Sequence, residues 1–183
     1  YYPLGGNAST GGDSSNTLSI PNVAVPDASV FDFVPNDYID CGNISTLNGA
    51  STATFSAWFN TDVTSALILM GTDTQFYIQV WAANNRIDFI TPAATQYRTT
   101  APTINDGEWY HLAIVFNKDG GSHTERYKGY INGVYYANER TTSTSDALPT
   151  TSNSFELGKY GSIGSQFNGK MSNIAIWNSD QSS

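Results

Sequence analysis

The stretch that decides the fold runs from Asp106 to Val134 and reads DGEWYHLAIVFNKDGGSHTERYKGYINGV. Between residues 109 and 116 the side chains alternate in direction along an extended backbone. One set comprises Tyr110, Leu112, Ile114 and Phe116, and the other comprises Trp109, His111, Ala113 and Val115. Because apolar residues occur in both sets, both faces of this strand can be covered. The pattern predicts a central strand of a two-layer sandwich.

A second strand follows the polar, glycine-rich loop 117–124 and ends at Asn132-Gly133. This dipeptide readily takes positive φ at both positions, and it therefore favours the type I′ turn of a β-hairpin. The quoted stretch predicts two long antiparallel strands.

Further strand signals recur about every 8 to 12 residues, which is typical of a sandwich or barrel. No segment sustains the 3.6-residue apolar period of a helix. The expected strands cover residues 1–4, 29–33, 38–41, 53–59, 65–71, 75–81, 86–89, 97–99, 155–159 and 167–177. We expect Ala53, Phe55, Ala57 and Phe59 to face the core.

Length and charge restrict the remaining possibilities. We expect residues 1–183 to form one domain, cut from a longer protein because the chain opens on Tyr1. The formal net charge of −8, with only 8 Lys and Arg residues, disfavours nucleic acid as a partner. No apolar run approaches the roughly 18 residues of a membrane span, so we expect no membrane insertion.

Seven short motifs carry a resemblance to a known family. In chain order they are YYPL (1–4), NDYID (36–40), FSAWF (55–59), DGEWYHLA (106–113), YINGV (130–134), ELG (156–158) and FNGKMSNIAIWN (167–178). Over nearly the whole chain they resemble laminin G-like domains of the concanavalin A-like lectin and glucanase superfamily. The resemblance implies an all-β, jelly-roll sandwich of two antiparallel sheets. It also implies that Trp109 and the Asn132-Gly133 turn serve folding.

Catalysis on the plan of this superfamily needs residues that the chain lacks. Its retaining glucanases carry a Glu-x-Asp-x-Glu strand, because two carboxyl groups about 5 Å apart must flank the glycosidic bond. Here the glutamates are scattered, and His111 and His123 show neither a Ser-His-Asp order nor metal-ligand spacing. We expect no enzymatic activity.

A candidate carbohydrate site comes from the side chains that point away from the core. Aromatic rings stack on the C–H faces of sugars, while amide and guanidinium groups reach hydroxyls. The hairpin 75–89 presents five such residues, and three more come from later strands. The candidate set is Tyr77, Gln79, Trp81, Arg86, Asp88, Tyr97, Arg98 and His111. The alternative is that these residues pack under long loops or against a neighbouring domain.

Two loop aspartates, Asp37 and Asp40, are candidate ligands for Ca²⁺, the one cofactor that we consider. Loop aspartates also commonly make turns.

We expect a non-catalytic carbohydrate-binding or adhesion module, located extracellularly, on a cell surface or on a virion. Its partners would be a glycan or glycosylated surface and neighbouring domains of the same protein. The alternatives are a purely structural module of a virion or surface assembly, or a degenerate glycan hydrolase.

Overall fold

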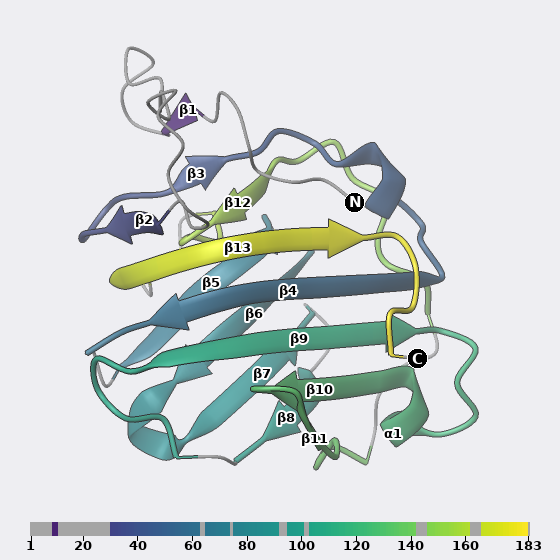
Figure 1. Cartoon of the computed structure of the whole chain (residues 1–183). Coiled ribbons are helices and arrows are strands. Elements are labelled where there is room, and N and C mark those ends of the chain that lie inside the picture. The colour runs from purple at the N-terminus through teal and green to yellow at the C-terminus, as the bar shows by residue number, and fades with distance from the viewer. Residues whose placement is uncertain are drawn as a thin grey trace, which may run out of the picture.

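Two antiparallel sheets pack face to face in the computed structural model (Figure 1). The described residues are 9–10, 30–62, 65–73, 75–91, 95–100, 103–141, 146–161 and 166–182. The expected strand 1–4 and most of the loop after it lie outside these residues. The fold expected from the strand pattern and from the resemblance is confirmed: a jelly-roll sandwich that is almost free of helix.

The first sheet has six strands and contains both strands of the quoted stretch, as predicted. Its order is β11 (Val134–Tyr136), β10 (Tyr127–Ile131), β9 (Trp109–Asn117), β4 (Thr52–Asn60), β13 (Gly169–Trp177) and β2 (Val30–Phe33). The turn between β10 and β11 has positive φ at Asn132 (51°) and Gly133 (78°), as the type I′ turn requires. The same turn fixes the register of the edge strand β11.

The second sheet has seven strands and lies behind the first in Figure 1. Its order is β1 (Ser9–Thr10), β3 (Ile39–Asp40), β12 (Phe155–Leu157), β5 (Ala66–Thr72), β6 (Phe76–Trp81), β7 (Arg86–Ile90) and β8 (Thr95–Thr99). Helical structure in the described residues is confined to α1 (His123–Arg126) and two 3₁₀ turns, η1 (Ser45–Leu47) and η2 (Ala82–Asn84). No helix among these residues has the length and apolar character needed to cross a membrane.

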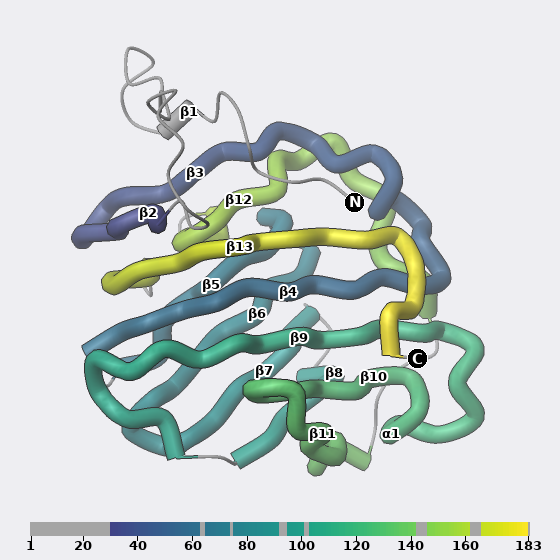
Figure 2. The backbone as a smooth tube through the Cα atoms, viewed as in Figure 1, coloured from purple at the N-terminus to yellow at the C-terminus, as the bar shows by residue number. Residues whose placement is uncertain are grey.

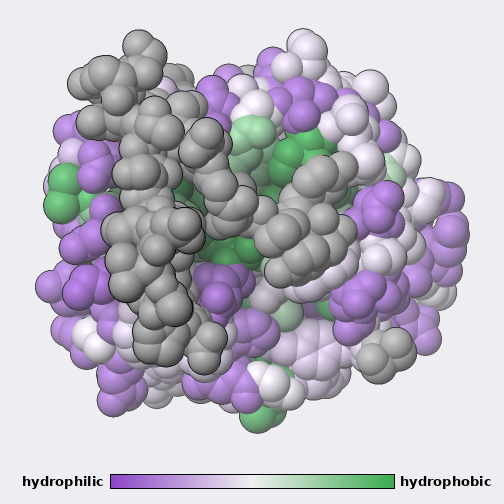
Figure 3. Space-filling view, turned by 45° about the horizontal axis from the view of Figure 1, so that its top comes forward, coloured by the Kyte–Doolittle hydropathy of each residue, from purple (hydrophilic) through white to green (hydrophobic). Residues whose placement is uncertain are grey.

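The core fills the space between the two sheets. On β4, Ala53, Phe55, Ala57 and Phe59 are all buried, as expected. Phe55 contacts the rings of Phe76, Phe89 and Phe155 from the opposite sheet. These aromatic contacts lock the two layers together, since each ring removes a large apolar area from water. The outer surface seen in Figure 3, in contrast, is mostly hydrophilic where it is described, with hydrophobic residues in scattered patches.

A β-bulge breaks the expected alternation of β13. The register with β4 shifts between Ser172 and Ala175, and Asn173 takes a positive φ of 46°. Met171 and Ile174 therefore both lie in the core, although strict alternation would place them on opposite faces. The bulge inserts one extra residue and so reverses the parity of the residues after it. The reversal places Trp177 on the outer face, where it pairs in register with Thr54.

The C-terminal tail, residues 178–182, folds back over the six-stranded sheet. Figure 2 shows it turning from the end of β13 past the ends of β4 and β9. Thr54 holds it from both sides: its hydroxyl donates to the carbonyl of Ser179 at 2.8 Å and accepts from the backbone N–H of Gln181 at 3.1 Å. The tail covers Val115, which is only 2% exposed although it points outward. It thereby forms a raised wall on an otherwise flat sheet.

Candidate functional site

A groove of about 360 Å³ lies on the outer face of the six-stranded sheet. Four strands and the C-terminal tail contribute to it. The lining residues are Thr54, Ser56, His111, Ala113, Val115, Tyr130, Gly133, Trp177, Gln181 and Ser182. Its volume falls in the range of small-molecule sites, which run from about 300 to about 1,000 Å³.

Strand register explains why a groove forms here. Ser56 pairs with Ala113, and Ala113 pairs with Tyr130, so these residues form one row across β4, β9 and β10. Ala175 of β13 extends the row beyond Ser56. Because Ser56 and Ala113 are small, they leave a trough on the outer face between Tyr130 of β10 and strand β13. Three inter-strand spacings, from β10 to β13, span about 14 Å.

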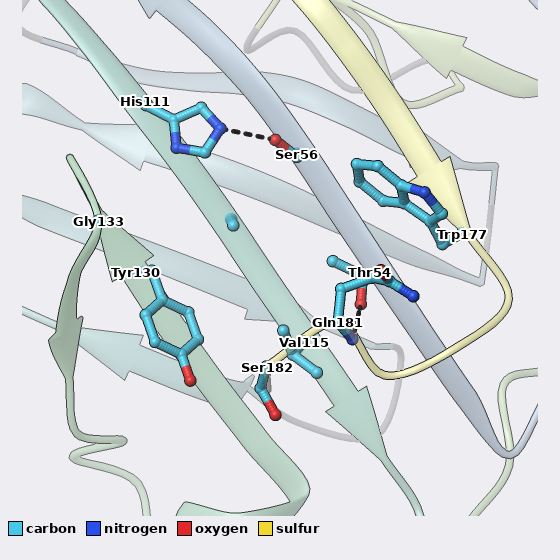
Figure 4. Close-up of a pocket in the computed structure, with 10 residues that line it drawn as sticks. Thr54, Ser56, His111, Val115, Tyr130, Gly133, Trp177, Gln181 and Ser182 are labelled. Carbon is cyan, nitrogen blue, oxygen red and sulfur yellow. Dashed lines mark hydrogen bonds between the residues drawn. The ribbon is translucent and has the colours of Figure 1, made fainter. Parts of the chain in front are cut away.

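Two aromatic rings flank the trough. Figure 4 shows Tyr130 on one side and Trp177 on the other, with the tail residues Gln181 and Ser182 closing one end. The ring of Tyr130 also contacts Tyr135 of β11, with 5.6 Å between centroids. This contact supports the ring of Tyr130 from the edge of the sheet.

Ser56 and His111 close the other end of the groove (Figure 4). Ser56 Oγ and His111 Nε2 share a hydrogen bond of 2.8 Å, and the imidazole packs against Trp58 with 5.3 Å between ring centroids. Burial lowers the pKa of His111 below its usual value, because desolvation disfavours the charged ring. The imidazole is therefore neutral at pH 7 and presents a polar but uncharged edge.

Six of the eight side chains of the candidate set lie together, but on the outer face of the other sheet. Tyr77, Gln79 and Trp81 project from β6, Arg86 and Asp88 from β7, and Arg98 from β8. We refer to these six residues as the arginine–aspartate face. Their common orientation follows from strand alternation, as expected from the sequence.

The polar groups of the arginine–aspartate face are bonded to one another. Asp88 is fully buried, and its carboxylate accepts from Gln79 Nε2 at 2.9 Å, Arg86 Nε at 2.6 Å and Arg98 Nε at 2.8 Å. An ionised carboxylate needs such partners when it leaves water. The groups expected to reach sugar hydroxyls are thus engaged in holding strands β6, β7 and β8 together.

The aromatic rings of this face also have partners within the protein. The guanidinium of Arg86 lies 5.1 Å from the Trp81 ring, and Tyr77 contacts Tyr160 with 4.5 Å between ring centroids. These contacts agree with the alternative interpretation, in which outward residues pack locally. The groove, by comparison, is a hollow whose lining includes the rings of Tyr130 and Trp177.

Two members of the candidate set lie elsewhere. Tyr97 is fully buried in the core, where its hydroxyl donates to the carbonyl of Tyr136 at 3.0 Å. Adjacent residues of a strand point to opposite faces, so Tyr97 and Arg98 cannot share a surface. His111 does point outward, but from the six-stranded sheet, and it lines the groove. Placing these two residues on the same face as the other six was wrong.

The two candidate Ca²⁺ ligands hydrogen-bond to backbone N–H groups in turns. Asp37 accepts from Val34 at 3.1 Å, and Asp40 accepts from Gly42 at 2.7 Å. Within the described ranges, no group of three or more His, Cys, Asp or Glu side chains is arranged to hold a metal ion. Calcium binding by Asp37 and Asp40 stays a prediction.

Comparison with known proteins identifies the family. Residues 34–183 match the laminin G-like model of the "Concanavalin A-like lectin/glucanases superfamily", so the chain belongs to this superfamily. The resemblance seen in the seven motifs is confirmed. No curated protein sequence matches the chain.

Solved structures share the fold at low sequence identity. A heptameric SAP-like pentraxin from Limulus polyphemus has a TM-score of 0.67 and 13% identity, over 87% of this chain and 80% of that one. A putative carbohydrate binding protein from Bacteroides ovatus has a TM-score of 0.63 and 21% identity, over 80% of this chain and 42% of that one.

A third structure is domain 4 of AbnA, an extracellular arabinanase from Geobacillus stearothermophilus, in complex with arabinotriose. Its TM-score is 0.61 at 21% identity, over 96% of this chain and 77% of that one. At these identities the comparisons establish the fold alone.

Proposed function

We propose that this chain is a non-catalytic carbohydrate-binding or adhesion module and that the groove is its ligand site. The observation that carries the proposal is the groove itself, in which two aromatic rings flank a trough floored by small side chains. Such rings offer flat faces for the C–H surface of a sugar, and neutral donors and acceptors beside them can bond hydroxyls. The span of about 14 Å from β10 to β13 suits a short oligosaccharide.

The relatives support this proposal. One neighbour is described as a putative carbohydrate binding protein, and another was solved with arabinotriose. The partner that we propose is a glycan or glycosylated surface, met outside the cell or on a cell or virion surface. A purely structural module is the alternative, in which the groove would be covered by a neighbouring domain.

Replacing Trp177 with Ala tests the proposal. A stacked ring worth about 1–2 kcal/mol should lower glycan affinity roughly five- to thirty-fold when it is removed. Trp109→Ala is the matched control, because Trp109 is a 38% exposed indole of the same sheet that does not line the groove. Both variants and the wild type are screened on a glycan array, and affinities are measured by calorimetry.

We expect wild type and Trp109→Ala to bind the same glycans with similar affinity, and Trp177→Ala to lose most of the binding. A thermal melt confirms that each variant is folded. A wild-type protein that binds no glycan would contradict the proposal. Equal affinity of Trp177→Ala and wild type would place the ligand outside the groove.

A further inference from the structure

The lining of the groove contains no Asp, Glu, Lys or Arg. Its one ionisable side chain near neutral pH is His111, which burial keeps in the neutral form. The remaining polar groups are hydroxyls, an amide and the indole N–H. Every hydrogen bond that the lining offers is therefore uncharged, in a protein whose formal net charge is −8.

Two charged side chains are bonded around Ser182, a residue of the lining. Lys128 Nζ donates to Ser182 Oγ at 3.0 Å. Asp180 accepts from the N–H of Ser182 at 2.8 Å and from its hydroxyl at 2.6 Å, and from Asn117 Nδ2 at 3.2 Å. Desolvation by partial burial raises the pKa of Asp180, but these hydrogen bonds and the charge of Lys128 outweigh it and lower that pKa. The cation is thus already balanced by a carboxylate.

An acidic sugar would meet a penalty in this groove. Its carboxylate or sulfate would give up water without gaining a counter-charge, and the unbalanced loss of hydration is unfavourable. The negative charge of the protein adds a repulsion at longer range, which salt screens. A neutral sugar loses only hydroxyl hydration, which the uncharged lining can replace.

We infer that the groove selects neutral glycans and discriminates against sialylated, sulfated and uronic acid-containing ones. This inference rests on the proposed function and deepens it, because it names the ligand class of the same site. The groove binds the sugar through stacking and uncharged hydrogen bonds. Charge affects the recognition only because acidic glycans are disfavoured.

Paired glycans that differ by one acidic group test the inference on the wild-type protein. We expect the neutral member of each pair to bind at least about tenfold more tightly, which corresponds to about 1.4 kcal/mol. Affinity for the neutral member should change little between about 0.05 and about 0.5 M NaCl, because no ionic contact is screened. Equal or tighter binding of the acidic member would overturn the inference and leave the proposed function standing. Binding of neither member would overturn both.

Gln181→Lys tests the electrostatic cause. Gln181 is an exposed wall residue that joins the sheet through its backbone, so its side chain can change without breaking that bond. The added cation should raise affinity for the acidic member at least about tenfold, and salt should reverse the gain. Val34→Lys is the control, because it adds the same charge away from the groove. Val34 is 55% exposed and lies just beyond the edge strand β2.

A gain in affinity for the acidic glycan in Gln181→Lys, but not in Val34→Lys, supports the inference. Equal gains in both variants would show that net charge, and not the lining, sets the preference, and would overturn it. An absence of gain in both variants would overturn it as well. A thermal melt of each variant checks that the fold is intact.

Discussion

Ser56 on β4 and His111 on β9 share a hydrogen bond of 2.8 Å across the outer face of the six-stranded sheet. Ser56 pairs in register with Ala113, and His111 pairs with Trp58, so the bond runs diagonally between two neighbouring pairs. It keeps the imidazole against the sheet at one end of the groove. Burial of the imidazole lowers the pKa of His111, so the folded protein disfavours the charged form of this side chain.

Acidification should destabilise the wild type through His111. The pKa of His111 is lowered in the folded state, whereas in the unfolded chain it has its ordinary value of about 6.5. Just below pH 6.5 the unfolded chain therefore binds more protons than the folded protein does. The stabilising contribution is therefore complete above about pH 6.5 and is lost as pH falls from that value through the folded-state pKa. We expect the melting temperature to fall less steeply between about pH 7 and about pH 5 in His111→Gln than in the wild type.

Thermal melts of the two proteins across this range measure the difference in slope. Ser56→Ala provides the companion variant. It should cost about 1 kcal/mol of stability at pH 7 by removing the hydrogen bond. Identical pH slopes for wild type and His111→Gln would show that His111 is not protonated differently in the folded and unfolded states.

Asp88→Ala should strongly destabilise the protein. The buried carboxylate binds Arg86 and Arg98, and its removal leaves two partly buried guanidinium groups without their anion. Breaking such a buried pair costs about 3 kcal/mol or more. Asp119→Ala is the control, because its bond to Lys118 is exposed and should be worth less than about 1 kcal/mol. Urea unfolding of both variants measures the two values, and similar losses would contradict the structural role of Asp88.

Trp81→Ala separates the two surfaces that could bind a sugar. Trp81 lies on the outer face under the guanidinium of Arg86, so its loss should cost about 1 kcal/mol of stability and open no core cavity. With the groove as the ligand site, glycan affinity should equal that of the wild type. A roughly five- to thirty-fold loss of affinity would instead assign the sugar to the arginine–aspartate face. A stability loss of about 3 kcal/mol or more would show that Trp81 packs as a core residue.

Calcium binding by Asp37 and Asp40 can be measured by linkage. A cation that binds only the folded protein raises its stability by RT ln(1 + [L]/Kd), so millimolar Ca²⁺ should raise the melting temperature relative to chelator. Asp37→Asn and Asp40→Asn should each reduce that rise, because each removes one hard oxygen ligand with formal charge. An equal melting temperature in Ca²⁺ and in chelator would exclude these two aspartates as a calcium site.

Strand alternation was enough to predict the sandwich and its core. Residues such as Phe55 and Phe76 alternate with polar neighbours, and a period of two residues fixes which side of the strand each occupies. The same rule correctly placed Tyr77, Gln79 and Trp81 on an outer face. The bulge at Asn173 could not be predicted in this way, because the rule assumes strict alternation and an inserted residue reverses the parity of every residue after it.

Alternation distinguishes inside from outside, but it does not tell which of two sheets a strand joins. His111 and Gln79 therefore looked equivalent in the sequence, although they lie on opposite outer faces of the sandwich. Tyr97 was a different error, since its position next to Arg98 already implied opposite directions. The partners of Asp88 were likewise hidden, because burial of an outward carboxylate depends on which side chains cover it.

By itself, therefore, the sequence determined the fold class, the core set and the outward direction of most candidate residues. These follow from the alternation of side chains along each strand, which is a local property of the chain. Only the tertiary structure decided where a site could exist. Ser56, His111, Tyr130 and Trp177 belong to four strands whose order, β4 with β9, β10 and β13, is set by long-range pairing. Such pairing depends on how whole strands satisfy their backbone hydrogen bonds and bury their inner faces together, and no local pattern records it.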